Sequence, residues 1–174
     1  IEWTLTVNAK AKANAAGFKV TDILQGKGLI YDTNSPIRVT QNNNNGETAS
    51  GSVVPDTIDW NPSLSNGFTY GTDENGKLTW SYTIPTNESG KYEYVFKYYT
   101  IARPGLDDEA YGNVGTLSKN DNSVSTGTII GPGKGTSGTD GVLSKQYGGL
   151  EPVKDQDGKV IAKYAKWTAT IHVP

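Results

Sequence analysis

The sequence of 174 residues contains no cysteine, no methionine and a single histidine. Without cysteine the chain has no disulfide framework, thiolate zinc site or thiol nucleophile, and one histidine gives little support to a histidine-dependent catalytic triad. No apolar run approaches the roughly 20 residues of a membrane-spanning helix. The 16 basic and 18 acidic residues give a net charge of -2 without blocks of one sign, so we expect no nucleic-acid or membrane partner. Neither a cofactor nor a metal is expected, and most enzyme chemistries are disfavoured.

The residues that are abundant favour strands joined by turns. Four Trp, ten Tyr and three Phe are core-forming side chains that a disordered chain lacks, and the 21 Gly are suited to turns. Apolar and polar residues alternate along most of the chain, as around Trp3, Leu5 and Val7, and no helical stripe is present. The stretch 41–52 is expected to be a loop, and 53–71 is expected to be irregular. The sequence therefore predicts an all-β fold, an immunoglobulin-like β-sandwich with extra strands.

Residues 131–141 have the glycine-rich composition of a linker, which divides the chain into a main sandwich domain at 1–130 and a strand segment at 142–174. The last strand, from Trp167, repeats the Trp-Thr-x-Thr-aliphatic pattern that begins at Trp3. Two amphipathic strands can look alike by chance, but a repeat at domain length indicates that the chain is a piece of a tandem array. The strand segment then resembles the start of a following repeat. It completes the sandwich in cis, or it inserts into a neighbouring copy by strand exchange.

Three polar side chains occupy positions where the alternation calls for an apolar residue: Asp22, Asn113 and Lys145. Asp22, for example, shares its face with Val20 and Leu24. A buried ionised group costs several kcal/mol unless it is paired, so these three side chains are expected to meet. The alternatives are that Asp22 ends a strand, that Asn113 marks a β-bulge, and that the Lys145 ammonium extends to solvent.

Such a trio could form a covalent bond without help from a cofactor. Burial disfavours both the lysine ammonium and the aspartate carboxylate, and a neutral amine is a nucleophile. A protonated Asp22 could donate a hydrogen bond to the side-chain carbonyl of Asn113 and carry protons as the Lys145 amine attacks and ammonia leaves. The product is a Lys–Asn isopeptide bond, formed once, so the chain is not expected to be an enzyme with turnover.

Five motifs follow one another in a recognisable order. They are Glu2-Trp3-Thr4-Leu5-Thr6-Val7-Asn8, Lys19-Val20-Thr21-Asp22-Ile23-Leu24 with Gly28-Leu29, the aromatic stretch 92–100, Tyr111-Gly112-Asn113, and Leu143-Ser144-Lys145. Together they resemble the isopeptide-forming, immunoglobulin-like domains of the collagen-adhesin family of Gram-positive surface proteins. The resemblance implies that Asp22 is the catalytic carboxyl, Asn113 the acceptor and Lys145 the nucleophile.

One departure from the family pattern concerns the nucleophile. The family places its lysine strand before the tryptophan strand, whereas Lys145 lies after the linker and matches the lysine of a following unit. The crosslink is therefore expected within the chain if the segment folds back, and between chains or absent if it does not. Lys10 and Lys12 are reserve nucleophiles in a polar turn.

The resemblance implies a stalk or adhesin domain of a cell-wall-anchored bacterial surface protein. Its partners would be the neighbouring domains of that protein, with a host matrix protein or glycan as a further partner. The alternative function is a ligand-binding module for matrix protein or carbohydrate that uses exposed aromatic side chains, namely Trp60, Tyr31 or Tyr99. A hydrolase with paired carboxylates is the least favoured reading, because no two acids are expected to face inward together.

Overall fold

The computed structural model describes residues 1–49, 53–103, 111–128, 143–154 and 156–171, and for 143–153 and 160–171 it describes the backbone alone. The described residues form strands and one short 3-10 helix, η1 (Ala9–Ala11). The strands are β1 (Glu2–Val7), β2 (Lys19–Leu24), β3 (Leu29–Tyr31), β4 (Ile37–Asn42), β5 (Thr57–Ile58), β6 (Phe68–Thr72), β7 (Leu78–Thr83), β8 (Glu93–Ala102), β9 (Asn113–Lys119), β10 (Asn122–Ser125), β11 (Leu143–Lys154) and β12 (Val160–Ile171).

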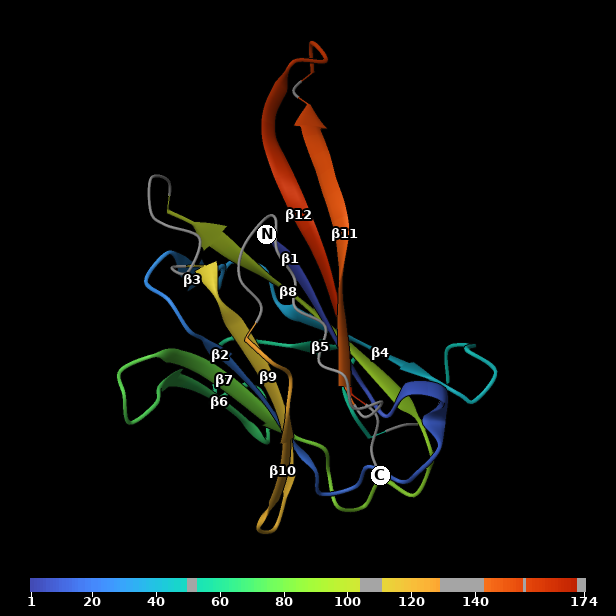
Figure 1. Cartoon of the computed structure of the whole chain (residues 1–174). Coiled ribbons are helices and arrows are strands. Elements are labelled where there is room, and N and C mark those ends of the chain that lie inside the picture. Colours follow the sequence, from blue (N-terminus) through green and yellow to red (C-terminus); the bar gives the residue numbers. More distant parts are fainter. Residues whose placement is uncertain (50–52, 104–110, 129–142, 155, 172–174) are drawn as a thin grey trace.

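The strands form two sheets that pack face to face (Figure 1). The first has the order β11-β12-β1-β8-β4-β5, with β3 also paired to β8, and the second has the order β10-β9-β2-β7-β6. Neighbouring strands are antiparallel except for β1 and β12. This architecture confirms the predicted all-β fold, a β-sandwich.

The alternation of side chains along the strands explains why the sheets face each other. In β1 and β8, the residues Trp3, Leu5, Tyr94, Phe96 and Tyr98 are each at most 2 % exposed, and they point to the same side of the first sheet. Across the core, the Trp80 ring of β7 lies 5.9 Å from the ring of Phe96 and 5.2 Å from that of Tyr98. Burying each of these large side chains contributes about 2 kcal/mol, so the aromatic contacts between β7 and β8 hold the two sheets together.

Two local expectations were only partly right. The stretch 41–52 begins with the last two residues of β4, and its described remainder, 43–49, is a loop in which Thr48 forms a single bridge with Asn42. The stretch 53–71 contains β5 and most of β6, because β6 pairs with β7 through a turn at 73–77. That turn is stabilised by Asp73, whose Oδ1 accepts hydrogen bonds from the backbone nitrogens of Asn75 and Lys77.

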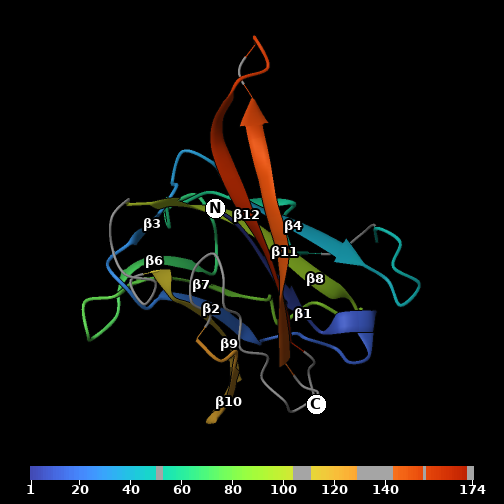
Figure 2. The ribbon, with the colours of Figure 1, turned by 45° about the horizontal axis from the view of Figure 1, so that its top comes forward.

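The C-terminal hairpin joins the sandwich at β1. Its strand β12 runs parallel to β1 in the register that pairs Trp3 with Trp167, so the two copies of the repeated motif lie side by side. Beyond this contact β11 and β12 pair with each other and extend past the body of the sandwich as a two-stranded ribbon (Figures 1 and 2). The predicted linker 131–141 lies outside the described residues, and the division of the chain into 1–130 and 142–174 stays a prediction.

Candidate functional site

Asp22 lies in the middle of β2, the central strand of the second sheet, where it pairs with Trp80 on one side and Gly115 on the other. Its side chain is 1 % exposed. Its carboxyl group receives two phenolic hydrogen bonds: Tyr31 Oη donates to Oδ1 at 2.8 Å, and Tyr98 Oη donates to Oδ2. The alternation of β2 placed this acid in the core, and the two hydroxyl donors satisfy its oxygens there.

Asn113 is the first residue of β9 and is fully buried at 0 % exposed. Its Nδ2 donates a hydrogen bond of 3.1 Å to the hydroxyl oxygen of Tyr98. The single Tyr98 proton points to Asp22, so a lone pair of the same oxygen is what faces the amide nitrogen. Within the described part of the chain, the carbonyl oxygen Oδ1 of Asn113 has no hydrogen-bond partner. A buried carbonyl without a donor is costly, and such exceptions call for a functional explanation.

The link between Asp22 and Asn113 differs from the sequence-based expectation. We expected Asp22 to donate directly to the Asn113 carbonyl, but Oδ1 of Asn113 accepts no hydrogen bond from Asp22 or from another described residue. The two side chains instead share Tyr98, which bonds the carboxyl on one side and the amide nitrogen on the other. In the alternating stretch 92–100, Tyr98 shares one face with Tyr94 and Phe96, and this pattern gives its hydroxyl no role. A signal was available, because a buried tyrosine hydroxyl usually has a hydrogen-bond partner.

The surroundings of this cluster are dry and aromatic. Burial, and then the negative charge of Asp22, raise the pKa of both Tyr31 and Tyr98 well above the ordinary value of 10.0. Both hydroxyls therefore keep their protons at neutral pH and act as hydrogen-bond donors. The Tyr31 ring lies 6.2 Å from the Tyr98 ring and 5.1 Å from the Trp60 ring, so aromatic groups fill the space around the carboxyl.

Close contact between the two sheets brings β9 over β1. Gly115, next to Asp22 across the β2–β9 pair, has no side chain, and a Cβ built there would lie 2.8 Å from Cδ1 of Leu5. The glycine thus lets Leu5 pack directly against the β9 backbone. This contact fixes how the strand that carries Asn113 sits over the first sheet.

The third predicted residue, Lys145, lies in β11, and its side chain is outside the described part of the structure. Its backbone pairs with Ala169 of β12, which in turn pairs with Leu5 of β1. Lys145 therefore lies level with the buried Leu5 across the sheet, in the same line of paired residues and two strands away. The reserve nucleophiles Lys10 and Lys12 are exposed, so neither is in the core.

The aromatic residues proposed for ligand binding are mostly not on the surface. Trp60 is 6 % exposed and Tyr31 is 4 % exposed, so the expectation that these two are exposed was wrong. Trp60 Nε1 donates to the Ser35 carbonyl oxygen at 2.7 Å, a contact typical of a core tryptophan. Tyr99 is half-buried, and its hydroxyl donates to Glu2 Oε2 at 2.9 Å.

Glu88 is a second buried acid, at 5 % exposed, that the sequence analysis missed. Its Oε1 accepts a hydrogen bond from the Gly90 nitrogen at 3.0 Å, and its charge helps burial to raise the pKa of Tyr94. Asp22 is bound by Tyr98, four residues further along β8, which corresponds to about 13 Å of strand. The two buried acids therefore sit beside different parts of β8 and do not form a carboxylate pair.

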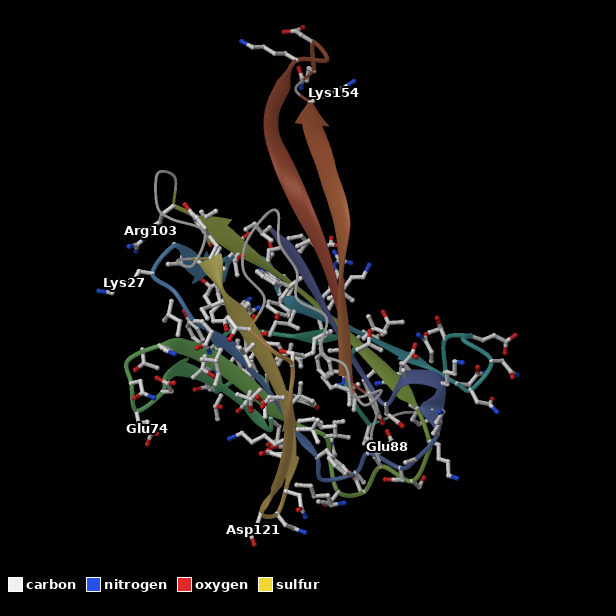
Figure 3. All side chains as sticks on the ribbon, in the orientation of Figure 1. Lys27, Glu74, Glu88, Arg103, Asp121 and Lys154 are labelled. Atoms are coloured by element: carbon white, nitrogen blue, oxygen red, sulfur yellow. The ribbon has the colours of Figure 1, made fainter. Side chains whose placement is uncertain are left out.

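The charged side chains labelled in Figure 3 include Lys27, Glu74 and Asp121, which extend outward from turns around the sandwich. Among the described residues, no group of three or more His, Asp or Glu side chains could hold a metal ion. Over the same ranges, no helix is long and apolar enough to cross a membrane. No family model, curated protein or solved structure matches the chain.

Proposed function

We propose that the chain is a structural domain that forms an isopeptide bond between a lysine and Asn113, assisted by Asp22. The observation that carries this proposal is the fully buried Asn113, whose amide nitrogen is linked through Tyr98 to the buried Asp22 and whose carbonyl has no hydrogen-bond partner among the described residues. The amine would attack the side-chain carbonyl carbon of Asn113, and a nearby carboxylate can take the proton that the amine must lose.

The bond would replace a buried side-chain amide and a buried amine by one neutral amide linkage, with ammonia as the leaving group and Asp22 unchanged at the end. Forming it requires no cofactor, because the amine displaces ammonia and the number of atoms is conserved. The product would tie β9 covalently to the strand that carries the lysine. A covalent tie between strands suits a domain that must resist unfolding under load.

Lys145 is the proposed source of the amine, from the same chain or from a neighbouring copy. Its row in the sheet is that of Leu5, and Leu5 contacts the backbone of β9 at Gly115. The β12 strand separates β11 from β1, and β12 itself repeats the β1 motif. In an array of such units, β12 of one unit could occupy the place of β1 in the next unit. The paired strand β11, which carries Lys145, would then lie in that next unit as well.

The biological setting follows from the resemblance to collagen-adhesin domains. The domain would belong to the stalk of a cell-wall-anchored protein on a Gram-positive bacterium, with neighbouring domains of that protein as its partners. The immunoglobulin-like form of the sandwich is part of this proposal.

Intact-protein mass spectrometry under denaturing conditions tests the function. The wild-type chain is expected to be ~17 Da lighter than its sequence, the mass of one ammonia. Asp22→Ala and Asn113→Ala are expected to have their full sequence masses, whereas Asp121→Ala, which changes an exposed acid, should keep the deficit. If the lysine comes from a second copy, the deficit appears in a covalent dimer. A wild-type chain that is folded, monomeric and of full mass would refute the proposed function.

A further inference from the structure

We propose that Tyr98 is a catalytic residue of this bond formation, which carries a proton from Asp22 to the leaving nitrogen of Asn113. This inference rests on the proposed function, since it assigns a role within the same reaction. Tyr98 is the residue that contacts both groups: its hydroxyl donates to Oδ2 of Asp22 and accepts from Nδ2 of Asn113 at 3.1 Å. The attacked carbon of Asn113 is bonded to this nitrogen, so the Tyr98 hydroxyl touches a reacting atom.

The proton balance of the reaction needs such a carrier. The amine loses one proton when it becomes an amide nitrogen, and Nδ2 of Asn113 must gain one proton to leave as ammonia. Asp22 Oδ2 is hydrogen-bonded to Tyr98, and Nδ2 in turn bonds the far side of the same hydroxyl. A carboxyl that has just received the amine proton can pass it to the Tyr98 oxygen, and the hydroxyl then gives its own proton to Nδ2. The C–N bond to Nδ2 breaks, ammonia leaves, and Tyr98 and Asp22 return to their starting states.

The hydrogen bonds seen in the structure, before any reaction, are suited to this series of proton transfers. Two hydroxyls donate to Asp22, from Tyr31 and Tyr98, which favours its ionised form and hence its role as the base that accepts the amine proton. The Tyr98 side chain is 2 % exposed, so bulk water has little access to the transfer. The high pKa of the buried phenol keeps the hydroxyl protonated, so the group moves a proton by exchange and never has to remain as a phenolate.

Tyr31 provides a matched control. Both tyrosines are nearly fully buried, and both donate to the Asp22 carboxyl, Tyr31 at 2.8 Å. Tyr31 has no hydrogen bond to Asn113 among the described contacts, whereas Tyr98 has one. The substitutions Tyr31→Phe and Tyr98→Phe therefore each remove one hydroxyl hydrogen bond to the Asp22 carboxyl, from Oδ1 and Oδ2 respectively. Tyr98→Phe alone also removes the path to the leaving nitrogen.

The experiment follows the ~17 Da mass loss over time in the full chain, synthesised in a cell-free extract and quenched in acid at intervals, at several pH values. Positioned proton transfer contributes roughly 100-fold or more, so Tyr98→Phe is expected to slow the loss by about that factor. Tyr31→Phe is expected to stay within about fivefold of the wild type, as befits a hydroxyl that only orients the acid. Equal rates for the two variants would overturn the role of Tyr98 while leaving the crosslink in place.

Two further outcomes are distinguishable. If the wild type itself never loses ammonia, the proposed function fails and the role of Tyr98 fails with it. If circular dichroism reports that Tyr98→Phe does not fold, 3-fluorotyrosine at position 98 replaces it, because fluorine acidifies the phenol with little change in shape. The pH profile of the mass loss should then move to lower pH, and an unchanged profile and rate would count against the proton transfer.

Discussion

The side-chain amide of Asn113 donates a hydrogen bond of 3.1 Å to the hydroxyl of Tyr98, and both side chains are at most 2 % exposed. Asn113 begins β9 in the second sheet and Tyr98 lies in β8 of the first, so this bond crosses the core of the sandwich. A polar bridge between two sheets is stable only where each of its members is satisfied. Among the described residues, the carbonyl oxygen Oδ1 of Asn113 is the one atom of this bridge that has no hydrogen-bond partner.

Removing the acid should destabilise the fold even where no crosslink can form. In the Asn113→Ala background, Asp22→Ala leaves two buried hydroxyls, of Tyr31 and Tyr98, without their acceptor, at about 1–3 kcal/mol for each. Denaturant unfolding should therefore report a loss of about 3 kcal/mol. Asp121→Ala in the same background changes an exposed acid and should stay within about 0.5 kcal/mol. A loss that is equally small for Asp22→Ala would contradict its described hydrogen bonds.

The contact between Gly115 and Leu5 should not tolerate an added methyl group. A Cβ at position 115 would lie 2.8 Å from Leu5 Cδ1, so Gly115→Ala is expected to cost about 1–3 kcal/mol by overpacking. Leu5→Val in the same chain should recover part of this cost, so that the double variant is more stable than the sum of the two single changes.

Gly71→Ala is the control for this change, because nothing lies within 4 Å of a Cβ there. It should leave the free energy of unfolding within about 0.5 kcal/mol of the wild type. If Gly115→Ala is as mild as Gly71→Ala, the two sheets do not approach each other at Gly115 as described.

The stability of the fold should fall in alkaline solution. Burial raises the pKa of Tyr82 to about 12 from the ordinary value of 10.0. Burial also raises the pKa of Tyr31 and of Tyr98. The unfolded chain therefore loses these protons first, and the free energy of unfolding decreases as pH rises above about 10. Tyr82→Phe should make this decrease shallower between pH 10 and pH 12, as measured by denaturant unfolding at each pH. A wild-type stability that is flat over this interval would exclude the raised pKa values.

Trp60 should behave as a core residue. Its ring lies within 5.1 Å of the rings of Tyr31 and Tyr70, so Trp60→Ala is expected to cost about 3–5 kcal/mol in thermal or denaturant unfolding. Tyr99→Ala removes a half-buried side chain and should cost about 1 kcal/mol. A small loss of stability for Trp60→Ala would contradict the buried position of this residue and would favour the ligand-binding alternative.

The sequence was informative wherever a strand alternates strictly. The parity of β2 correctly predicted that Asp22 faces the core, and the parity of β8 puts Phe96 and Tyr98 on one face, because side chains two residues apart must lie on one face of a strand. Parity does not say which residue of another strand stands opposite. The meeting of Asp22 with Tyr31 and Tyr98 depends on pairings such as β3 with β8, between segments far apart in the chain.

The errors have the same origin. The ligand-binding alternative required Tyr31 at the surface, whereas the pairing of β3 with β8 brings this residue into the core. The expectation of an irregular segment at 53–71 failed at β5 and β6 alone, since β6 contains Gly71 and polar residues and its strand form depends on pairing with β7. For Lys145, the alternation on β11 gives a register position, and its partner in the crosslink stays a prediction.

The most direct test of the covalent tie is peptide mapping of the purified chain by tandem mass spectrometry after proteolysis. We expect one branched peptide, in which the segment around Asn113 is joined to a lysine segment, that of Lys145, with the loss of one ammonia. Recovery of the Asn113 peptide in linear form, with its side-chain amide intact, from folded wild-type protein would contradict it.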